Sequence, residues 1–119
     1  MAQTRRIVIS QVVGSSICVA SDDGHKVYDR VAESFQAQIP VVLSFHGVTR
    51  LTTAFLNAAV GQLYNEFSDA FIREHLSFED IDNMSLDLLR RVVQRAKLYF
   101  RDMERNRRVV EEVTEGEDD

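Results

Sequence analysis

The amino-acid sequence predicts an α/β domain in which helices pack on a sheet. Short β-rich segments alternate with segments of helical periodicity, in the order strand, helix, strand, helix, strand, helix. The chain has 119 residues, of which 45% are hydrophobic, so it can bury a core without disulfides or metals. We expect one domain over residues 1–110, followed by an acidic, disordered tail over residues 111–119.

The N-terminal third predicts a strand, a turn and a helix. The segment IVISQVV, residues 7–13, is β-rich with little charge, and Gly14-Ser15-Ser16 then indicates a turn. The following ICVA is either a short strand or a buried connection. A helix capped by Ser21 or Asp22 is expected over residues 23–38, because apolar residues recur there at every fourth position: Val27, Val31 and Phe35.

The middle of the chain predicts two more strands and a second helix. VVLSF, which follows Pro40, is typical of a buried strand. The next helix is expected after Thr52 and Thr53, with one apolar face formed by Leu56, Val60, Leu63 and Phe67. SDAFIREH, residues 68–75, continues or restarts a helix, and LSFEDID, residues 76–82, predicts a third strand.

The longest helix is expected to begin at a cap formed by Asn83 or Ser85 and to end near Arg105. Its apolar residues alternate between spacings of three and four, and they form one stripe: Leu86, Leu89, Val93, Ala96, Phe100 and Met103. Such a stripe either covers the chain's own sheet or pairs with a second copy, so a homodimer is one expectation.

Charge and composition argue against several classes of protein. The net charge of −5 disfavours general nucleic-acid binding. The sequence has no apolar run of 18 residues, and its N-terminus lacks the apolar segment of a signal peptide, so no membrane association is expected. The single cysteine, Cys18, cannot form an internal disulfide, which favours a reducing, cytoplasmic setting.

The sequence contains no pattern typical of catalysis. The histidines His25, His46 and His75 lack further ligands at metal-binding spacing, and no glycine loop with the spacing of a phosphate site is present. The carboxylate clusters at residues 22–23 and 79–82 are typical of helix caps and solvated strand ends. We therefore expect no enzyme, no metal and no cofactor.

The Thr52-Thr53 pair at the start of the second helix has two interpretations. Either hydroxyl can cap the helix by accepting a hydrogen bond from a backbone N–H of the first turn. Alternatively, a phosphate on a hydroxyl at this position would be stabilised by the free N–H groups of that turn. The capping interpretation is the simpler of the two.

The segment VVLSFHGVTRLTTAFLNAAVGQLYNEF resembles STAS domains, the sulfate transporter and anti-sigma factor antagonist family. It is more similar to a STAS-like family of unknown function found in bacteria, archaea and phages. The residues that match its pattern of strand, loop and hydroxyl-rich helix start are Phe45, Gly47, Val48, Thr52, Thr53 and Phe55. GSSICVAS and LLRRVVQRAKLYF add to a resemblance that covers residues 6–103.

The resemblance implies a mixed sheet with helices mainly on one face, and a regulatory role in partner switching. Typical STAS domains bind an ATPase of the histidine-kinase type, and a serine at the helix start is phosphorylated. That serine falls at Ala54 here, so Thr53 is the nearest candidate acceptor. The leading expectation is a non-catalytic interaction module whose partner-binding residues are His46, Arg50, Thr52, Thr53, Phe55 and Asn57.

Two other functions are compatible with the sequence. A small-ligand or nucleotide sensor would bind an anion between the Gly14-Ser15-Ser16 turn and the helix start near Thr53. Nucleic acid would bind the basic helix that runs from Arg90 to Arg108, but the acidic tail would compete with its phosphates. We therefore regard nucleic-acid binding as the least favoured of the three functions.

Overall fold

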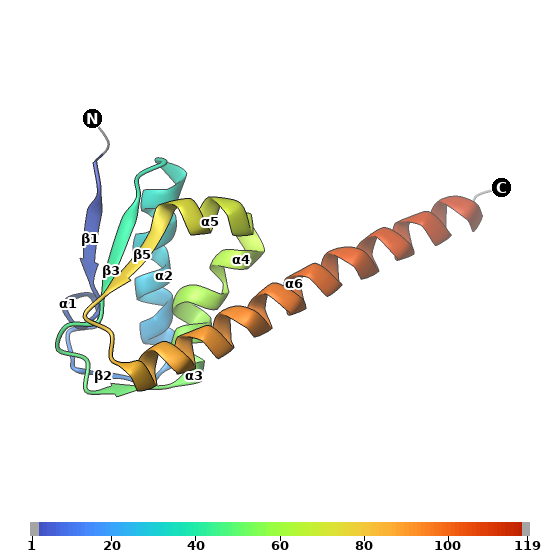
Figure 1. Ribbon diagram of the computed structural model, residues 1–119. Helices are drawn as coiled ribbons and strands as arrows, with labels where there is room; N and C mark the ends of the chain where they lie inside the picture. Colours follow the sequence, from blue (N-terminus) through green and yellow to red (C-terminus); the bar gives the residue numbers. More distant parts are fainter. Residues whose placement is uncertain (1–2, 118–119) are drawn as a thin grey trace.

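The computed structural model describes the backbone of residues 3–117 and the side chains of residues 3–101. Figure 1 shows a body of strands and helices from which the last helix, α6 (Asn83–Glu117), extends. The described chain measures 60 × 35 × 23 Å along its principal axes. In this part of the chain, no helix combines the length and the apolar character needed to cross a membrane.

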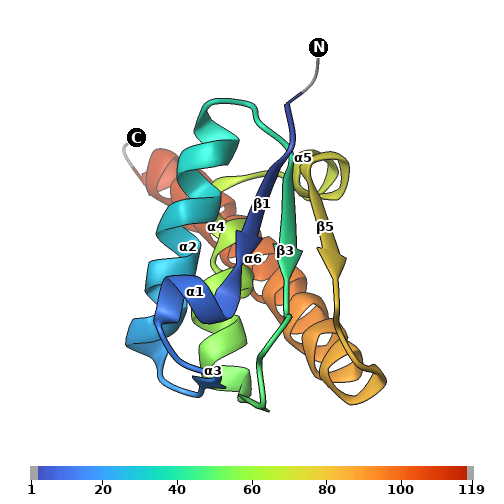
Figure 2. The same ribbon diagram turned by 90° about the vertical axis from the view of Figure 1, so that its left-hand side faces the viewer.

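The main sheet has three parallel strands in the order β1 (Arg5–Val8), β3 (Val41–Ser44), β5 (Leu76–Glu79). Ile7 pairs with Leu43, and Leu43 with Phe78, so three apolar residues form one row across the sheet. The helices gather on one face of this sheet (Figure 2). The predicted α/β class is therefore confirmed, although every strand pair among residues 3–117 is parallel rather than mixed.

Only the first part of the first predicted strand is a strand in the structure. β1 ends at Val8, and Ile9–Val13 form a short helix, α1, where the sequence predicted a strand through Val13. Gly14 closes this helix with a φ of 78°, a conformation that glycine adopts without steric cost. Ile9 is fully buried, so tertiary packing outweighs the β propensity of this segment.

A second, smaller sheet joins two segments that are far apart in the sequence. β2 (Ile17–Cys18) lies at the predicted ICVA segment, and it pairs in parallel with β4 (Arg50–Leu51). The sequence did not predict β4, because a strand of two residues has no detectable period. This pairing carries residues 50–52 beside the start of the first long helix.

Helix α2 (Ser21–Gln36) begins and ends two residues before its predicted bounds and buries the predicted Val27, Val31 and Phe35. The predicted cap at Ser21 or Asp22 is wrong, because the N-cap position is Ala20 and no side chain caps the helix. Gly24 is buried where α2 meets the helices that follow β4. A Cβ at Gly24 would lie 2.5 Å from the carbonyl oxygen of Phe55, so glycine permits this close contact.

The second predicted helix is broken into three pieces. They are α3 (Thr53–Leu56), a π-helical turn η1 (Asn57–Gly61) and α4 (Leu63–Glu66). The extra residue in the π turn changes the helical register, yet Leu56, Val60 and Leu63 are all fully buried. A separate helix, α5 (Asp69–His75), then starts at the cap residue Ser68, so the chain restarts a helix here instead of continuing one.

Helix α6 starts where the sequence predicted, but its cap is Asp82, whose carboxylate accepts the backbone N–H of Ser85 at 2.7 Å. Leu89, Val92 and Ala96 face the body and are buried. The helical backbone continues past the expected end near Arg105 to Glu117. The side chains of residues 102–119 and the backbone of residues 118–119 lie outside the described part of the chain, and the separate acidic tail at 111–119 stays a prediction.

Candidate functional site

The predicted site begins with a turn that α1 holds in place. After β3, Gly47 adopts a φ of 81°, and the backbone N–H of Val48 donates to the carbonyl oxygen of Phe45 at 3.1 Å. The Ser10 hydroxyl donates to the carbonyl oxygen of His46 at 3.0 Å. Glycine is required at this turn because its positive φ is strained for other residues, and a Cβ would lie 3.3 Å from the Ser10 hydroxyl.

Thr52 caps α3, as the simpler interpretation of the threonine pair predicted. Its hydroxyl accepts the backbone N–H of Phe55 at 3.2 Å and donates to the carbonyl oxygen of Val19 at 2.7 Å. One hydroxyl therefore satisfies a free N–H group of the helix and also ties the helix start to the chain that follows β2. Thr52 is half-buried and has a structural role.

The next residues divide between solvent and core. Thr53, Ala54 and Asn57 are exposed, so they form an outer face of α3 and η1. Phe55 is 0% exposed and belongs to the core, which corrects its prediction as a partner-binding residue. The reason is that α3 lies between α2 and α6, so Phe55 and Leu56 are both enclosed although they are adjacent in sequence.

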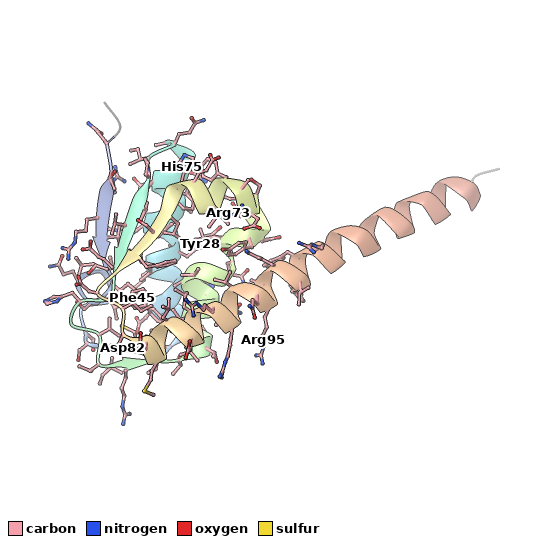
Figure 3. All side chains as sticks on the ribbon, viewed as in Figure 1. Tyr28, Phe45, Arg73, His75, Asp82 and Arg95 are labelled. Carbon is pink, nitrogen blue, oxygen red and sulfur yellow. The ribbon has the colours of Figure 1, made fainter. Side chains whose placement is uncertain are left out.

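The exposed face of α3 and η1 borders a groove shared with α6. We call it the helix-start groove; it has a volume of about 470 Å³ and is lined by residues that include Thr53, Asn57, Val92, Arg95, Ala96 and Tyr99. Tyr99 is 61% exposed, and Arg95 projects away from the body (Figure 3). The groove therefore has an apolar wall and a cationic rim.

A second groove lies on the other side of Thr52. We call it the strand-edge groove; it has a volume of about 700 Å³ and is lined by residues that include Val19, Arg50, Thr52, Asp82, Met84 and Arg91. Met84 is 85% exposed, and Val19 and the neighbouring Ile17 are exposed as well. Exposed large apolar side chains that gather beside charged ones are typical of a recognition surface.

The structure therefore brings four of the six predicted partner-binding residues to these grooves. Arg50 and Thr52 line the strand-edge groove, while Thr53 and Asn57 line the helix-start groove. His46 is exposed but lies at the turn after β3, and it is not among the residues that line either groove.

Sequence reasoning missed the contribution of α6 to this surface. From the sequence, Arg91 and Arg95 belong only to a basic helix, and neither Met84 nor Tyr99 is a candidate site residue. The signal was present, because Met84 and Tyr99 are large apolar residues outside the stripe that predicted the core. An apolar residue off the buried face of an amphipathic helix indicates an exposed apolar surface.

One carboxylate caps the start of α6, and another forms an ion pair between α5 and α6. The pKa of Asp82 lies below its ordinary value because its carboxylate accepts the backbone N–H of Ser85. The pKa of Asp69 is lowered first by a hydrogen bond from Lys97, whose Nζ lies 3.2 Å from the Asp69 Oδ1. The first bond is local to the start of α6, whereas the second links α6 to α5.

The buried thiol of Cys18 is not an activated nucleophile. Burial and the nearby Asp23 raise the pKa of the Cys18 thiol, which keeps it protonated. Among the described residues, no cluster of three or more histidine, cysteine, aspartate or glutamate side chains is placed to hold a metal ion.

A family model described as a STAS-like domain of unknown function (DUF4325) matches residues 23–86 of this chain. The match covers more than half of the 119 residues, and it includes most of α2, the main strands β3 and β5, and the whole segment from the turn at Gly47 to α5. No curated protein and no solved structure gives a significant match.

Proposed function

This chain belongs to the family of STAS-like domains of unknown function, and from that premise we propose that it is a non-catalytic module that binds a partner protein. The proposed partner is an ATPase of the histidine-kinase type, which the module regulates or is regulated by. This choice of partner rests on the resemblance to STAS domains, in which such ATPases are the typical partners.

The observation that supports the proposal is the pair of grooves on either side of Thr52. Together they expose Val19, Met84 and Tyr99, which are apolar, and they are rimmed by arginines at positions 50, 91 and 95. Interfaces commonly combine apolar or aromatic anchors with arginine at the rim. The Thr52 hydroxyl also links the start of α3 to the chain after β2, through one hydrogen bond to each.

Phosphate transfer to this surface has a candidate acceptor in Thr53. Its hydroxyl is exposed at the first residue of α3, whereas Ala54, at the position of the typical acceptor, carries no hydroxyl. Thr53 also lines the helix-start groove, so a phosphate on it would add two negative charges beside Arg95. Binding without phosphorylation is the simpler form of the proposal.

The test is capture of the partner with the full-length chain, followed by identification of the captured protein by mass spectrometry. Arg50→Glu reverses a charge in the strand-edge groove, and we expect it to abolish capture of the ATPase. Arg30→Glu is the matched control, because Arg30 is exposed on α2 and does not line either groove. Equal loss of capture with both variants, or capture of no ATPase, would refute the proposal.

A second readout separates binding from phosphorylation. Intact-mass analysis of the recovered chain shows one added phosphate if Thr53 is an acceptor, and Thr53→Ala should abolish it. If no phosphate appears and Thr53→Ala still captures the partner, the module binds without a phosphate switch. If no partner is captured but nucleotides raise the melting temperature, the anion-sensor alternative becomes the better account.

A further inference from the structure

The strand-edge groove and the helix-start groove meet along one face of α6. Residues of α6 that line them recur at spacings of three or four and so form one stripe: Met84, Leu88, Arg91, Arg95 and Tyr99. On the opposite wall, the adjacent residues Thr52 and Thr53 line one groove each, and α3 contacts α6 (Figure 1). We call this continuous surface the α6 trough; its stripe is about 22 Å long.

Positive charge in the α6 trough has no partner within the described chain. Three exposed arginines line the trough: Arg50, Arg91 and Arg95. None of the three forms an ion pair with a carboxylate among residues 3–101. The trough also contains two carboxylates, but Asp82 accepts the backbone N–H of Ser85 at 2.7 Å, and Asp87 lies 3.8 Å from Arg90. The trough is therefore complementary to a ligand with several negative charges.

Apolar side chains lie at both ends of the trough. Among residues 3–101, five large apolar side chains are exposed, and all except Leu98 lie in the trough or directly beside it: Ile17, Val19, Met84 and Tyr99. Met84 is 85% exposed at one end, and Tyr99 is 61% exposed at the other. Apolar patches of this kind favour a protein surface over a nucleic acid, because a protein offers apolar side chains to cover them.

The walls of the trough favour a helical segment over an extended one. Apart from their ends, α3 and α6 pair their backbone groups within each helix, so they offer no row of free N–H and C=O groups. The strands beside the trough, β2 and β4, have only two residues each. An extended segment would therefore lose water from its backbone without gaining hydrogen bonds, whereas a helix satisfies its own backbone and presents one face.

We propose that the α6 trough binds an acidic amphipathic helix of the partner protein; this assignment rests on the proposed function. Arg91 and Arg95 are one turn apart, so two carboxylates four residues apart on the partner helix can each contact one arginine. Arg50 adds a third positive charge from the opposite wall. Apolar residues of the partner helix, one to two turns beyond its carboxylates, then cover Met84 and Tyr99.

The test measures binding of synthetic helical peptides to the full-length chain by fluorescence anisotropy. The first peptide has about 18 residues, with two central glutamates four residues apart and a leucine one to two turns beyond on each side, all on one face. The matched peptide has the same composition, but its two leucines lie on the opposite face. We expect the matched peptide to bind at least tenfold more weakly. This comparison leaves the chain unaltered, so it does not depend on the folding of a variant.

The contribution of charge is tested with two pairs of substitutions. Arg91→Glu with Arg95→Glu should weaken binding of the first peptide by tenfold or more, and should strengthen binding of a peptide that carries lysines in place of the glutamates. Arg30→Glu with Arg101→Glu is the matched control, because both arginines are exposed and line neither groove. The control changes the net charge equally, and we expect it to leave binding nearly unchanged.

The contribution of the apolar ends is tested in the same way. Met84→Ala should weaken binding of the first peptide by roughly fivefold, because the truncated side chain is covered less well by the peptide. Leu98→Ala is the matched control, since Leu98 is 58% exposed on α6 but lines neither groove. Both residues are exposed, so neither change disturbs the core.

The proposal is overturned by any of four results: no saturable binding of the first peptide, equal binding of both peptides, equal weakening by the two pairs of arginine substitutions, or stronger binding of a single-stranded DNA oligonucleotide of equal charge. Failure of this proposal is distinguishable from failure of the proposed function. If an ATPase is captured through Arg50 but no acidic helix binds, only the present proposal fails. If the acidic helix binds but no ATPase is captured, only the choice of partner fails.

Discussion

Gly24→Ala provides the sharpest test of how the site is positioned. Gly24 lies in the first turn of α2, where alanine would ordinarily stabilise a helix by about 1 kcal/mol relative to glycine. However, a Cβ at this position would lie 2.5 Å from the carbonyl oxygen of Phe55 and 2.8 Å from the Cβ of Ala58. Both distances are well inside van der Waals contact, so α2 and α3 would have to move apart.

The magnitude follows from the competition between these two effects. Inserting a methyl group into a close-packed contact typically costs about 1–3 kcal/mol. The upper part of that range applies, because neither opposing atom can move by a rotation of a side chain. The Phe55 oxygen belongs to the backbone, and the Ala58 Cβ is bonded directly to it. After the gain in helix propensity is subtracted, we expect Gly24→Ala to lower the free energy of unfolding by about 1–2 kcal/mol.

Urea denaturation of the wild type and Gly24→Ala measures this change, with Ala58→Gly and the double variant completing a cycle. Ala58→Gly removes one of the two clashing atoms, so the double variant should lose less stability than the sum of the single changes. Equal or greater stability of Gly24→Ala would refute the close contact between α2 and α3. Additive effects in the cycle would show that Ala58 is not the neighbour of residue 24.

Three further predictions concern the cap, the start of α6 and the thiol. Thr52→Ala should lower the free energy of unfolding by about 1 kcal/mol in urea denaturation, because it removes the cap of α3, and Thr52→Ser should restore most of it. The folded-state pKa of Asp82 is lowered, so its contribution to stability is complete above the ordinary value of 3.8 and disappears as the pH falls through the lowered pKa. The stability difference between wild type and Asp82→Ala should therefore shrink in acid, and a difference that stays constant with pH would contradict the assignment. Cys18 should react with iodoacetamide far more slowly in the folded chain than in urea, since burial restricts access and raises its pKa; equal rates would show that the thiol is accessible.

Long periodic segments could be predicted from the sequence because the spacing of their apolar residues indicates which face is buried. The fourfold spacing of Val27, Val31 and Phe35 located α2, and the apolar run VVLSF located β3. By contrast, the helix at Ile9–Val13 and the two-residue strand β4 depend on contacts with distant parts of the chain. Segments this short contain too few residues for a period to be detected.

The candidate site was predictable in position but not in composition. The resemblance located the segment from Gly47 to Asn57, and capping chemistry explained Thr52. The direction of Phe55 was not predictable, because it depends on α2 and α6 enclosing α3 from both sides. The arginines of α6 were missed for a related reason: only the fold brings residues 91 and 95 beside residues 50 and 53.

The two hydrogen bonds of the Thr52 hydroxyl connect residues that line different grooves. Val19, whose carbonyl oxygen accepts one bond, lines the strand-edge groove, and the N–H of Phe55, which donates the other, belongs to the helix that presents Thr53 to the helix-start groove. A molecule that displaces Val19 therefore pulls on the cap of α3.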